Sequence, residues 1–423
     1  MDTLTSKLGL FLSDSTLKAK VLFVLGILII FRALAAIPVP GVDALRLEQF
    51  FTNNQILGFL DIFSGGGLSS LSIVMLGVGP FITASIIMQL STMLSSRLKA
   101  MYQEDGEAGR KRFGQYSRIL TVPLALIQGF SFLILLERQQ VLTHLTTFGF
   151  VANLIIIATG SLLLMWLGEL VSEFGIGNGV SLIIFAGIVS RIPTTISQLA
   201  FTFDPSQIPA YLGFGAVALL TVAAVVSITE AERPIPVTYA RRVRGAKVYG
   251  GISTYLPLRV NQAGVIPIIF ALSILLFPQM LSNLLSYAGN ATINKIGALV
   301  SGFFADSWVY GIGYFVLVFL FTYFYTAVTF DPDSISGNLQ KSGAFIPGVR
   351  PGASTSEYLS RILVRITFVG ALFLGVIAVL PLIMQGLTGI KALAIGGTAL
   401  LIVVSVVLDL IRKIDAQVSM REY

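Results

Sequence analysis

The side chains that could carry out chemistry are few in this chain and stand apart from one another. The sequence has 21 Asp and Glu residues, one histidine and no cysteine. Without cysteine there is no disulfide framework, no thiolate nucleophile and no thiolate metal ligand. The histidine, His144, has no companion ligands that could complete a site, so we interpret it as a solvated loop residue. The sequence therefore predicts no catalytic residue, no metal site and no cofactor.

The carboxylates also lack the arrangement that an intramembrane enzyme or an ion-coupled transporter needs. No two Asp or Glu residues fall together in the middle of an apolar segment, and neither an HExxH motif nor a GxxxxGK[ST] phosphate loop is present. Arg32 is the deepest charge, and five other ionisable residues fall near cytoplasmic segment ends: Glu169, Glu173, Glu230, Arg365 and Asp409. Secondary transport normally uses ionisable groups at the midplane, and it remains the alternative interpretation.

A glycine-rich stretch has a clearer functional pattern than any polar cluster. Residues 61–94 begin with a triple glycine in an apolar segment that is too short to cross a bilayer, and they continue into a segment that is long enough. Irregular backbone at membrane depth is tolerated only where it is buried in protein or lines a water-filled cavity. We therefore interpret this stretch as a half-helix that acts as a removable stopper, followed by one wall of a pore.

The elements that must position this stretch are membrane spans. The chain has 423 residues, of which 55% are hydrophobic and 12% are charged, whereas soluble domains have about 25% charged residues. Apolar runs of about 18 residues or more recur along the whole sequence, and each can span a bilayer. The predicted spans are 20–38, 73–94, 119–136, 151–171, 179–199, 210–230, 262–284, 308–330, 361–384 and 392–411.

The positive charges predict the orientation of these spans. Of the 28 Lys and Arg residues, 22 fall on the side that holds the N-terminus, 5 fall on the other side and Arg32 lies within a span. Positive charges accumulate on the cytoplasmic side, so both termini are expected to be cytoplasmic. Division into residues 1–200 and 201–423 gives five spans per half, and an odd number per half inverts one half relative to the other.

Two cytoplasmic loops are long and basic. Residues 232–261 alternate β-branched or aromatic residues with basic ones around Gly250 and Gly251, which predicts a projecting β-hairpin. Residues 331–360 are rich in Gly, Pro and Ser, with Arg350 at a predicted turn. The loops could serve only the positive-inside bias. A loop needed only for orientation could be short, however, so a docking role is the second interpretation.

Many co-linear motifs make the chain resemble the SecY family, whose members form the channel of the general protein-secretion translocon. The motifs are IPVPGVD (37–43), FSGGGLSSLSI (63–73), GPFITASIIMQL (79–90), EDGEAGRKRFGQYSR (104–118), MWLGE (165–169), GIGNGVSLIIFAGI (175–188), LPLRVNQAGVIPIIFA (256–271), FYTAV (324–328), KSGAFIPGVRPG (341–352) and GGTALLIVV (396–404). The resemblance implies an all-α polytopic membrane protein, with ten transmembrane helices in two inverted halves around a central hourglass pore.

The resemblance also implies a plug and a constriction. The plug falls on residues 61–71, which include Asp61, Ile62, Phe63, Ser64, Gly65, Gly66, Gly67 and Leu68. We name the expected constriction the collar; it comprises Val78, Ile82, Ile184, Ile269 and Ile402. Branched aliphatic side chains suit a collar because a narrow apolar passage dewets and resists ion flow. Without the resemblance, ordinary packing within a helix bundle would explain each of these residues.

Further positions follow from the same resemblance. A lateral gate, through which apolar segments leave for lipid, would lie between spans 2–3 and 7–8, with Thr83, Gln128 and Asn261 lining it; simple helix packing is the alternative for these three polar residues. The docking residues for cytosolic partners would be Arg241, Arg242, Arg244, Lys247 and Arg350. At the family's paired-basic position this chain has Ala246 before Lys247, which favours protein contact there over RNA contact.

The resemblance implies a non-enzymatic protein with several partners. These are the membrane subunits SecE and SecG, the motor ATPase SecA, the ribosome, the secretory precursor polypeptide and the lipid bilayer. The expected location is the cell inner (cytoplasmic) membrane.

Overall fold

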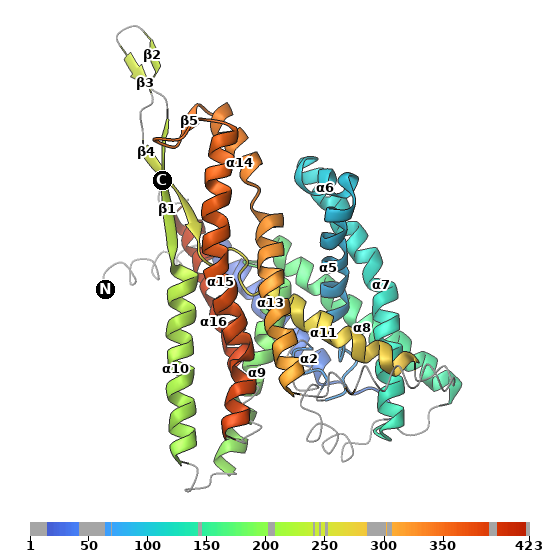
Figure 1. Cartoon of the computed structure of the whole chain (residues 1–423). Helices are drawn as coiled ribbons and strands as arrows, with labels where there is room; N and C mark the ends of the chain where they lie inside the picture. The colour runs from blue at the N-terminus through green and yellow to red at the C-terminus, as the bar shows by residue number, and fades with distance from the viewer. Residues whose placement is uncertain are drawn as a thin grey trace.

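The structure, a computed structural model, is mainly a bundle of long helices with a small β-structure at one end (Figure 1). It describes residues 15–41, 64–68, 70–142, 146–201, 208–239, 242–244, 247–249, 253–285, 302, 307–388 and 396–419. His144 lies outside these residues.

One described helix lies on each of the ten predicted spans. The first five are α2 (Ser15–Ala35), α5 (Gly79–Leu94), α7 (Gly106–Arg138), α8 (Thr147–Phe174) and α9 (Gly179–Phe201). The others are α10 (Ile208–Glu230), α11 (Ile266–Leu285), α13 (Ser307–Thr329), α15 (Ala353–Thr388) and α16 (Gly396–Ser419). Within the described residues, five helical stretches are long and apolar enough to cross a membrane; they fall on α7, α8, α10, α13 and α15.

Some helices extend beyond the predicted spans because polar residues continue the helix. α7 begins at Gly106 and α15 at Ala353, both earlier than predicted, because an apolar window detects only the part of a helix that crosses lipid. α5 differs in the other direction, since it begins at Gly79 and has only 16 residues. Gly77 has a positive φ of 58°, which ends the preceding turns, and Pro80 stands in the first turn of α5, where its missing N–H costs nothing.

The helices pack into two groups that meet along two lines. In the first half, α5 packs on α7 and α8, and α9 packs on α2 and α8. In the second half, α13 packs between α11 and α15, and α10 packs on α16. Contacts between the halves join α11 to α5 and α7 on one side and α16 to α9 on another. The bundle is therefore joined by two seams, which we call the α5/α7–α11 seam and the α9–α16 seam.

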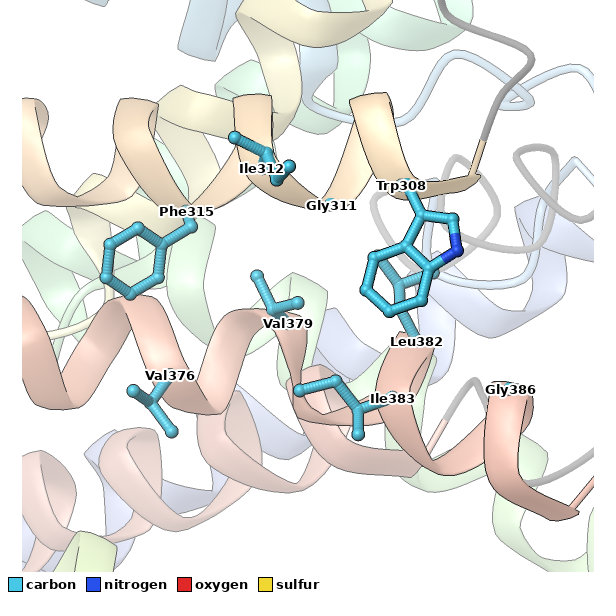
Figure 2. Close-up of a pocket in the computed structure, with 9 residues that line it drawn as sticks. All are labelled: Trp308, Gly311, Ile312, Phe315, Val376, Val379, Leu382, Ile383 and Gly386. Atoms are coloured by element: carbon cyan, nitrogen blue, oxygen red, sulfur yellow. The ribbon is translucent and has the colours of Figure 1, made fainter.

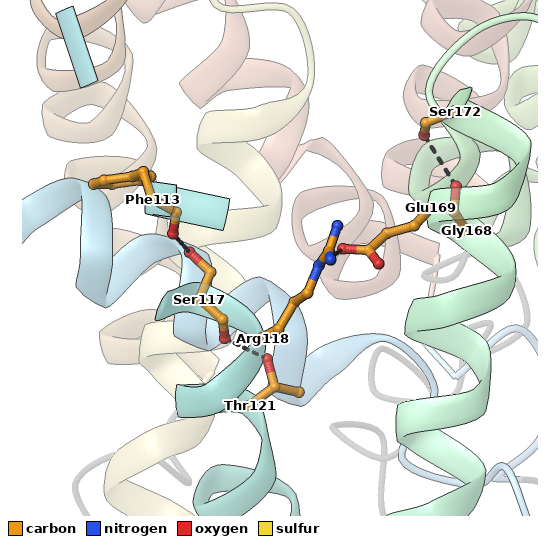
Figure 3. Close-up of polar contacts among 7 residues, drawn as sticks. All are labelled: Phe113, Ser117, Arg118, Thr121, Gly168, Glu169 and Ser172. Atoms are coloured by element: carbon orange, nitrogen blue, oxygen red, sulfur yellow. Dashed lines mark hydrogen bonds and ion pairs between the residues drawn. The ribbon is translucent and has the colours of Figure 1, made fainter. Parts of the chain in front are cut away.

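A polar contact joins α7 and α8 near the ends of two of the sequence motifs. Figure 3 shows Arg118 of α7 reaching across to Glu169 of α8, and the guanidinium Nε donates to a carboxylate oxygen at 2.5 Å. On the same helices, Thr121 and Ser172 donate their hydroxyls to backbone carbonyls one turn earlier. The Arg118 side chain is half exposed, so this ion pair contributes about 0.2–1 kcal/mol and mainly sets how the two helices align.

The predicted β-hairpin in residues 232–261 is confirmed. Strand β1 (Glu232–Tyr239) pairs antiparallel with β4 (Ser253–Arg259), and a smaller hairpin, β2 (Arg242–Arg244) with β3 (Lys247–Tyr249), stands farther from the bundle (Figure 1). The position expected for the reversal was wrong. Arg244 pairs with Lys247, so the chain reverses between these two residues and not around Gly250 and Gly251.

The predicted turn at Arg350 is also confirmed, but residues 331–360 are more regular than a loop. They contain α14 (Pro332–Lys341), strand β5 (Ala344–Phe345) and the start of α15. Asp331 caps α14 by accepting from the backbone N–H of Asp333 at 3.1 Å. β5 adds to β1 and completes a three-stranded sheet in the order β4-β1-β5.

The sheet has its own small apolar core, separate from that of the bundle. Every second residue of the middle of β1 faces inward, so Ile235 and Val237 are buried while their neighbours are exposed. They pack with Leu258 of β4, with Ile346, which follows β5, and with Leu359 of α15. The core fixes the sheet on the end of α15, which lies at the same end of the bundle as the short helix α6 (Ser96–Gln103) (Figure 1).

This core allows a test of how the sheet is held. Leu258 is fully buried, and Leu258→Ala is expected to cost about 2–5 kcal/mol because it leaves a cavity. Hydrogen–deuterium exchange of the β1 amides should then accelerate at least tenfold, while exchange in α7 and α8 stays unchanged. Tyr255→Ala, on the same strand but 67% exposed, is the matched control and should leave β1 exchange unchanged. Equal exchange in the two variants would contradict this account of the sheet.

Candidate functional site

The five collar residues come from four helices and meet in the interior of the bundle. Val78 caps the start of α5, Ile82 lies one turn into that helix, and the others lie on α9, α11 and α16. All five belong to one continuous cluster of buried apolar side chains. Their exposed fractions range from 0% for Val78 and Ile184 to 6% for Ile82 and Ile269. The collar helices are those of both seams, so a shift at either seam changes the collar.

The described part of the plug is a compact set of turns and not the predicted half-helix. Residues 64–68 form hydrogen-bonded turns, and Gly65 and Gly66 have φ angles of 67° and 84°. A right-handed helix requires negative φ throughout, so two consecutive left-handed residues exclude it, and glycine adopts this conformation without strain. The expectation of a half-helix was therefore wrong for these residues. Asp61, Ile62 and Phe63 lie outside the described residues.

Close backbone contact with α9 seats the plug. A Cβ atom built on Gly187 of α9 would overlap the backbone of Gly65, including its Cα atom. A Cβ on Gly65 would overlap the ring of Phe31 from α2. Both glycines are therefore required for this approach. Gly187 follows the collar residue Ile184 by three positions, which places the two on the same face of α9 about one turn apart.

A cation from α2 also contacts the plug. Arg32 of α2 donates from Nη1 to the carbonyl oxygen of Gly65 at 3.2 Å. A hydrogen bond from a charged donor contributes about 1.5–3 kcal/mol. Arg32 is the deepest charge of the predicted spans, and a charge at such depth is expected to have a partner. The partner could not be read from the sequence, because a glycine carbonyl is not marked by any side chain.

Serine hydroxyls stabilise the plug from within. Ser64 accepts from the backbone N–H of Leu68 at 2.9 Å, and Ser72 donates to the carbonyl of Gly67 at 3.0 Å. Ser70 donates to the carbonyl of Ala35 at the end of α2, at 2.8 Å. The plug thus holds its own shape through short local bonds, while Leu68 and Leu71 attach it to a buried apolar cluster that includes residues of α7 and α8.

The three expected gate residues do not form one group. Gln128 of α7 donates to the hydroxyl of Thr83 of α5 at 3.4 Å, so these two lie on the same side of the expected gate. Asn261 lies before α11, where its amide donates to the carbonyl of Gly264 at 3.3 Å and its Oδ1 is buried without a hydrogen-bond partner. A described hydrogen bond between the two halves runs from Gln103 of α6, which donates to the carbonyl of Val328 in α13 at 3.5 Å.

The expected docking residues lie at the end of the bundle that carries the sheet. Arg350 is exposed, and its carbonyl accepts from the hydroxyl of Thr355 at 2.9 Å, which fixes the turn that presents its side chain. Arg242, Arg244 and Lys247 are residues of the β2–β3 hairpin. Arg241 lies outside the described residues. Among the residues that the structure covers, no group of three or more His, Asp or Glu side chains could hold a metal ion.

A family model described as SecY matches residues 72–411, which is most of the chain. The chain belongs to the SecY family. It is 43% identical over 427 residues to the protein translocase subunit SecY of Thermotoga maritima, covering 96% of this chain and 94% of the relative. It is 40% identical to that of Mycobacterium bovis, covering 96% of each chain.

Solved structures share the fold of this SecY-family chain. One, described as "The structure of a protein conducting channel", has a TM-score of 0.64 at 20% identity and covers 93% of this chain and 91% of its own. Another concerns the plug domain of a SecY protein that stabilises the closed state of its translocation channel. It has a TM-score of 0.65 at 20% identity, with coverage of 96% and 93%. The expected membership and mainly helical membrane fold are thus confirmed.

Sequence reasoning did not assign the residues that seat the plug in this SecY-family chain. Phe31 and Gly187 look like ordinary span residues, and only close contact in the folded chain gives them a role. Two features of the sequence could have drawn attention to these contacts. Gly187 lies within the motif at 175–188, and Arg32 is an isolated charge in an apolar span. Neither signal identifies residues 64–68 as the partner.

The Gly65–Gly187 contact predicts what happens when a side chain is added. Gly187→Val should prevent the plug from seating, because its side chain would occupy the position of the Gly65 backbone. Ser64 is 2% exposed and the chain has no cysteine, so a Ser64→Cys variant carries one buried thiol. Adding Gly187→Val should raise the rate at which a water-soluble maleimide labels this thiol at least tenfold.

Gly213→Val is the matched control, because a Cβ at Gly213 of α10 meets nothing within 4 Å. It should leave the labelling rate unchanged. Equal labelling rates in the Gly187 and Gly213 variants would show that Gly187 does not seat the plug.

Proposed function

We propose that this chain is the channel subunit of a protein translocase, and that it passes unfolded secretory polypeptides across the cell inner (cytoplasmic) membrane. The observation that carries the proposal is the buried collar with the plug seated one helical turn away, in a chain of the SecY family. The function is that of a channel, and family members act without enzymatic chemistry of their own.

The collar accounts for the closed state. Its five side chains are 94% or more buried and entirely aliphatic, so they leave no wet path between them. A narrow apolar constriction also dewets, which opposes the passage of ions. When a polypeptide enters, Val and Ile side chains can part around it without offering it a hydrogen bond. The collar therefore seals tightly at rest and does not retain its substrate.

The plug accounts for a second seal that can be removed. The described polar contacts that attach it to α2 are those of Arg32 and Ser70, and its contact with α9 is the backbone approach of Gly65 to Gly187. These hydrogen bonds contribute a few kcal/mol. Burial of Leu68 and Leu71 adds about 1.5–3 kcal/mol for each side chain. The plug keeps its internal serine bonds when it moves, so it can leave and return as a unit.

The α5/α7–α11 seam is the proposed lateral gate. The Thr83–Gln128 bond keeps α5 and α7 together as one side of the gate, while Gln103 crosses to the carbonyl of Val328 at its cytoplasmic end. Hydrogen bonds between membrane helices contribute about 0.6–2 kcal/mol, and one at 3.5 Å belongs at the weak end. The backbone at Asn261 lies close to Gly370 of α15. We propose that Asn261 sets the position of α11 at the gate.

The two halves, 1–200 and 201–423, are proposed to be inverted repeats with both termini cytoplasmic. The β4-β1-β5 sheet, α14 and α6 all lie at one end of the bundle, as the distribution of positive charge requires of cytoplasmic segments (Figure 1). The membrane subunits SecE and SecG would brace the two seams, since a bundle that opens sideways needs support around its outside.

The sheet and the turn at Arg350 are proposed to dock the cytosolic partner, either the motor ATPase SecA or the ribosome. The β2–β3 hairpin, which includes Arg242, Arg244 and Lys247, stands away from the helix bundle, and Arg241 precedes it in the sequence. An Arg guanidinium can bind a carboxylate or phosphate through two hydrogen bonds, which Lys cannot imitate. Contact with ribosomal RNA through these residues should weaken steeply with salt.

The positions of the ion pairs favour the channel over a secondary transporter. Glu169, Glu230 and Asp409 pair with Arg118, Arg412 and Lys413 near the ends of the predicted spans. Paired carboxylates at helix ends stabilise helix packing, whereas a transporter needs such groups at its midplane site. Energy for transport is therefore proposed to come from the docked partner.

Reconstitution tests the function and the docking role together. Vesicles that contain this chain with SecE and SecG should take up a secretory precursor when SecA and ATP are added. Arg350→Glu should reduce uptake at least tenfold, because the reversed charge repels the carboxylates that the guanidinium binds. Insertion of membrane proteins that do not need SecA should remain normal in this variant.

Lys341→Glu makes the same charge change at another exposed position of residues 331–360, and it should retain most of the uptake. Normal uptake with Arg350→Glu would refute the docking role of this residue. Uptake of a small solute without any uptake of precursor would refute the channel and favour the transporter.

A further inference from the structure

A pocket lies between α13 and α15, away from the collar and the plug. It is lined by Trp308, Gly311, Ile312 and Phe315 from α13 and by Val376, Val379, Leu382, Ile383 and Gly386 from α15. In Figure 2, Phe315 and Trp308 extend from α13 toward α15 at the two ends of the pocket, with Val379 between them. The pocket occupies the end of the two helices opposite α14 and β5.

The pocket exists because the packing of α13 on α15 changes along their length. At Gly375 the helices are close, since a Cβ there would lie 2.7 Å from the ring of Phe315. At Gly311 a Cβ would make only ordinary contact, at 3.5 Å from Leu382. At Gly386 a Cβ would meet nothing within 4 Å. The two helices therefore leave a groove that widens toward their ends.

The groove is apolar and open to the outside of the bundle. Its volume is about 610 Å³, within the 300–1,000 Å³ typical of sites for small molecules. The indole nitrogen of Trp308 is the one polar side-chain atom among the lining residue types. The rim of the groove is exposed on the outside of two helices that are long and apolar enough to span a membrane. Its exposed residues are Trp308, Ile312, Val376 and Ile383. Lipid therefore reaches the groove directly.

The length of the groove matches one leaflet. Phe315 follows Trp308 by seven residues and Gly386 follows Val376 by ten, which at 1.5 Å per residue corresponds to about 10–15 Å along the helices. The hydrocarbon core of a bilayer is about 30 Å thick, so one leaflet is about 15 Å. Trp308 lies at the second residue of α13, and Trp is enriched at the level of the lipid head groups.

We propose that this groove is a binding site for one acyl chain of a phospholipid, in the leaflet away from α14 and β5. The chain lies between Phe315 and Trp308 on one side and Val376, Val379 and Ile383 on the other. Its head group lies at the level of Trp308. Binding requires only that α13 and α15 span a membrane. That this leaflet is the outer one rests on the proposed function, in which both termini are cytoplasmic.

An acyl chain fits the groove better than a helix of a partner subunit. Helices that pack closely in membranes meet along continuous stripes of small residues. Here the glycines lie at the base and the end of the groove, and the bulky side chains of Trp308 and Ile312 stand on its rim. A helix about 10 Å wide would rest on these side chains without filling the space beneath them, whereas a flexible chain can bend around them.

Fluorescence quenching can detect this binding, because the chain has only two tryptophans, Trp166 and Trp308. In a Trp166→Phe variant, Trp308 is the only indole. A phosphatidylcholine with a dibrominated acyl chain, titrated into the detergent-solubilised full chain, should quench Trp308 to a plateau. Gly386→Leu, which fills open space in the groove, should raise the half-saturating lipid fraction at least fivefold, and Gly311→Ala should raise it less.

Two controls make the result specific. Gly213→Leu adds the same side chain to an exposed glycine of α10 with open space around it, and it should leave the half-saturating fraction unchanged. A Trp308→Phe variant reports on Trp166, which is exposed on α8, and its quenching should rise in proportion to lipid without a plateau.

The proposal is overturned if Trp308 quenching rises in proportion to the brominated lipid and Gly386→Leu does not change it. It is also overturned if protein purified with its membrane subunits shows no Trp308 quenching at any lipid fraction, since a protein segment would then fill the groove. Failure of precursor uptake in the same preparations would affect the proposed function alone.

Discussion

The proposed closed state depends on the direct approach of two backbones, that of Gly65 in the expected plug and that of Gly187 in α9. Because neither residue has a side chain, the plug lies one helical turn from the collar residue Ile184 on the same face of α9. This position lets Arg32 reach the Gly65 carbonyl and lets the ring of Phe31 pack against Gly65. We therefore propose that the collar and the plug are coupled through α9, so that a shift of that helix would alter both together.

The two seams explain how a tightly packed bundle can still open. Most of the close helix pairs lie within one half or the other, and the halves meet where α11 packs on α5 and α7 and where α16 packs on α9. The collar residues come from these same helices. Parting the α5/α7–α11 seam would widen the collar and expose it to lipid, while the α9–α16 seam keeps the halves together.

The sequence predicted the helices and the hairpin well, because apolar length and alternation are local signals. The family motifs named five collar residues, which the structure brings into one buried apolar cluster. It misplaced the hairpin reversal, which the pairing of Arg244 with Lys247 sets through the register of both strands. It also predicted a half-helix where Gly65 and Gly66 adopt left-handed conformations, since an apolar segment does not reveal the sign of φ. The partners of Arg32 and Gly187 are backbone atoms distant in sequence, and no pattern of side chains marks them.

The most direct test of the account is to trap a polypeptide on its way through the collar. The chain has no cysteine, so a single cysteine can be placed at Ile402 in the collar, or at Ile312 on the outer surface of α13 as a control. A secretory precursor with one cysteine in its middle is then stalled during SecA-driven transport and oxidised. We predict a disulfide to the cysteine at position 402 and none to that at 312. Cross-linking to 312 with none to 402 would contradict passage through the collar.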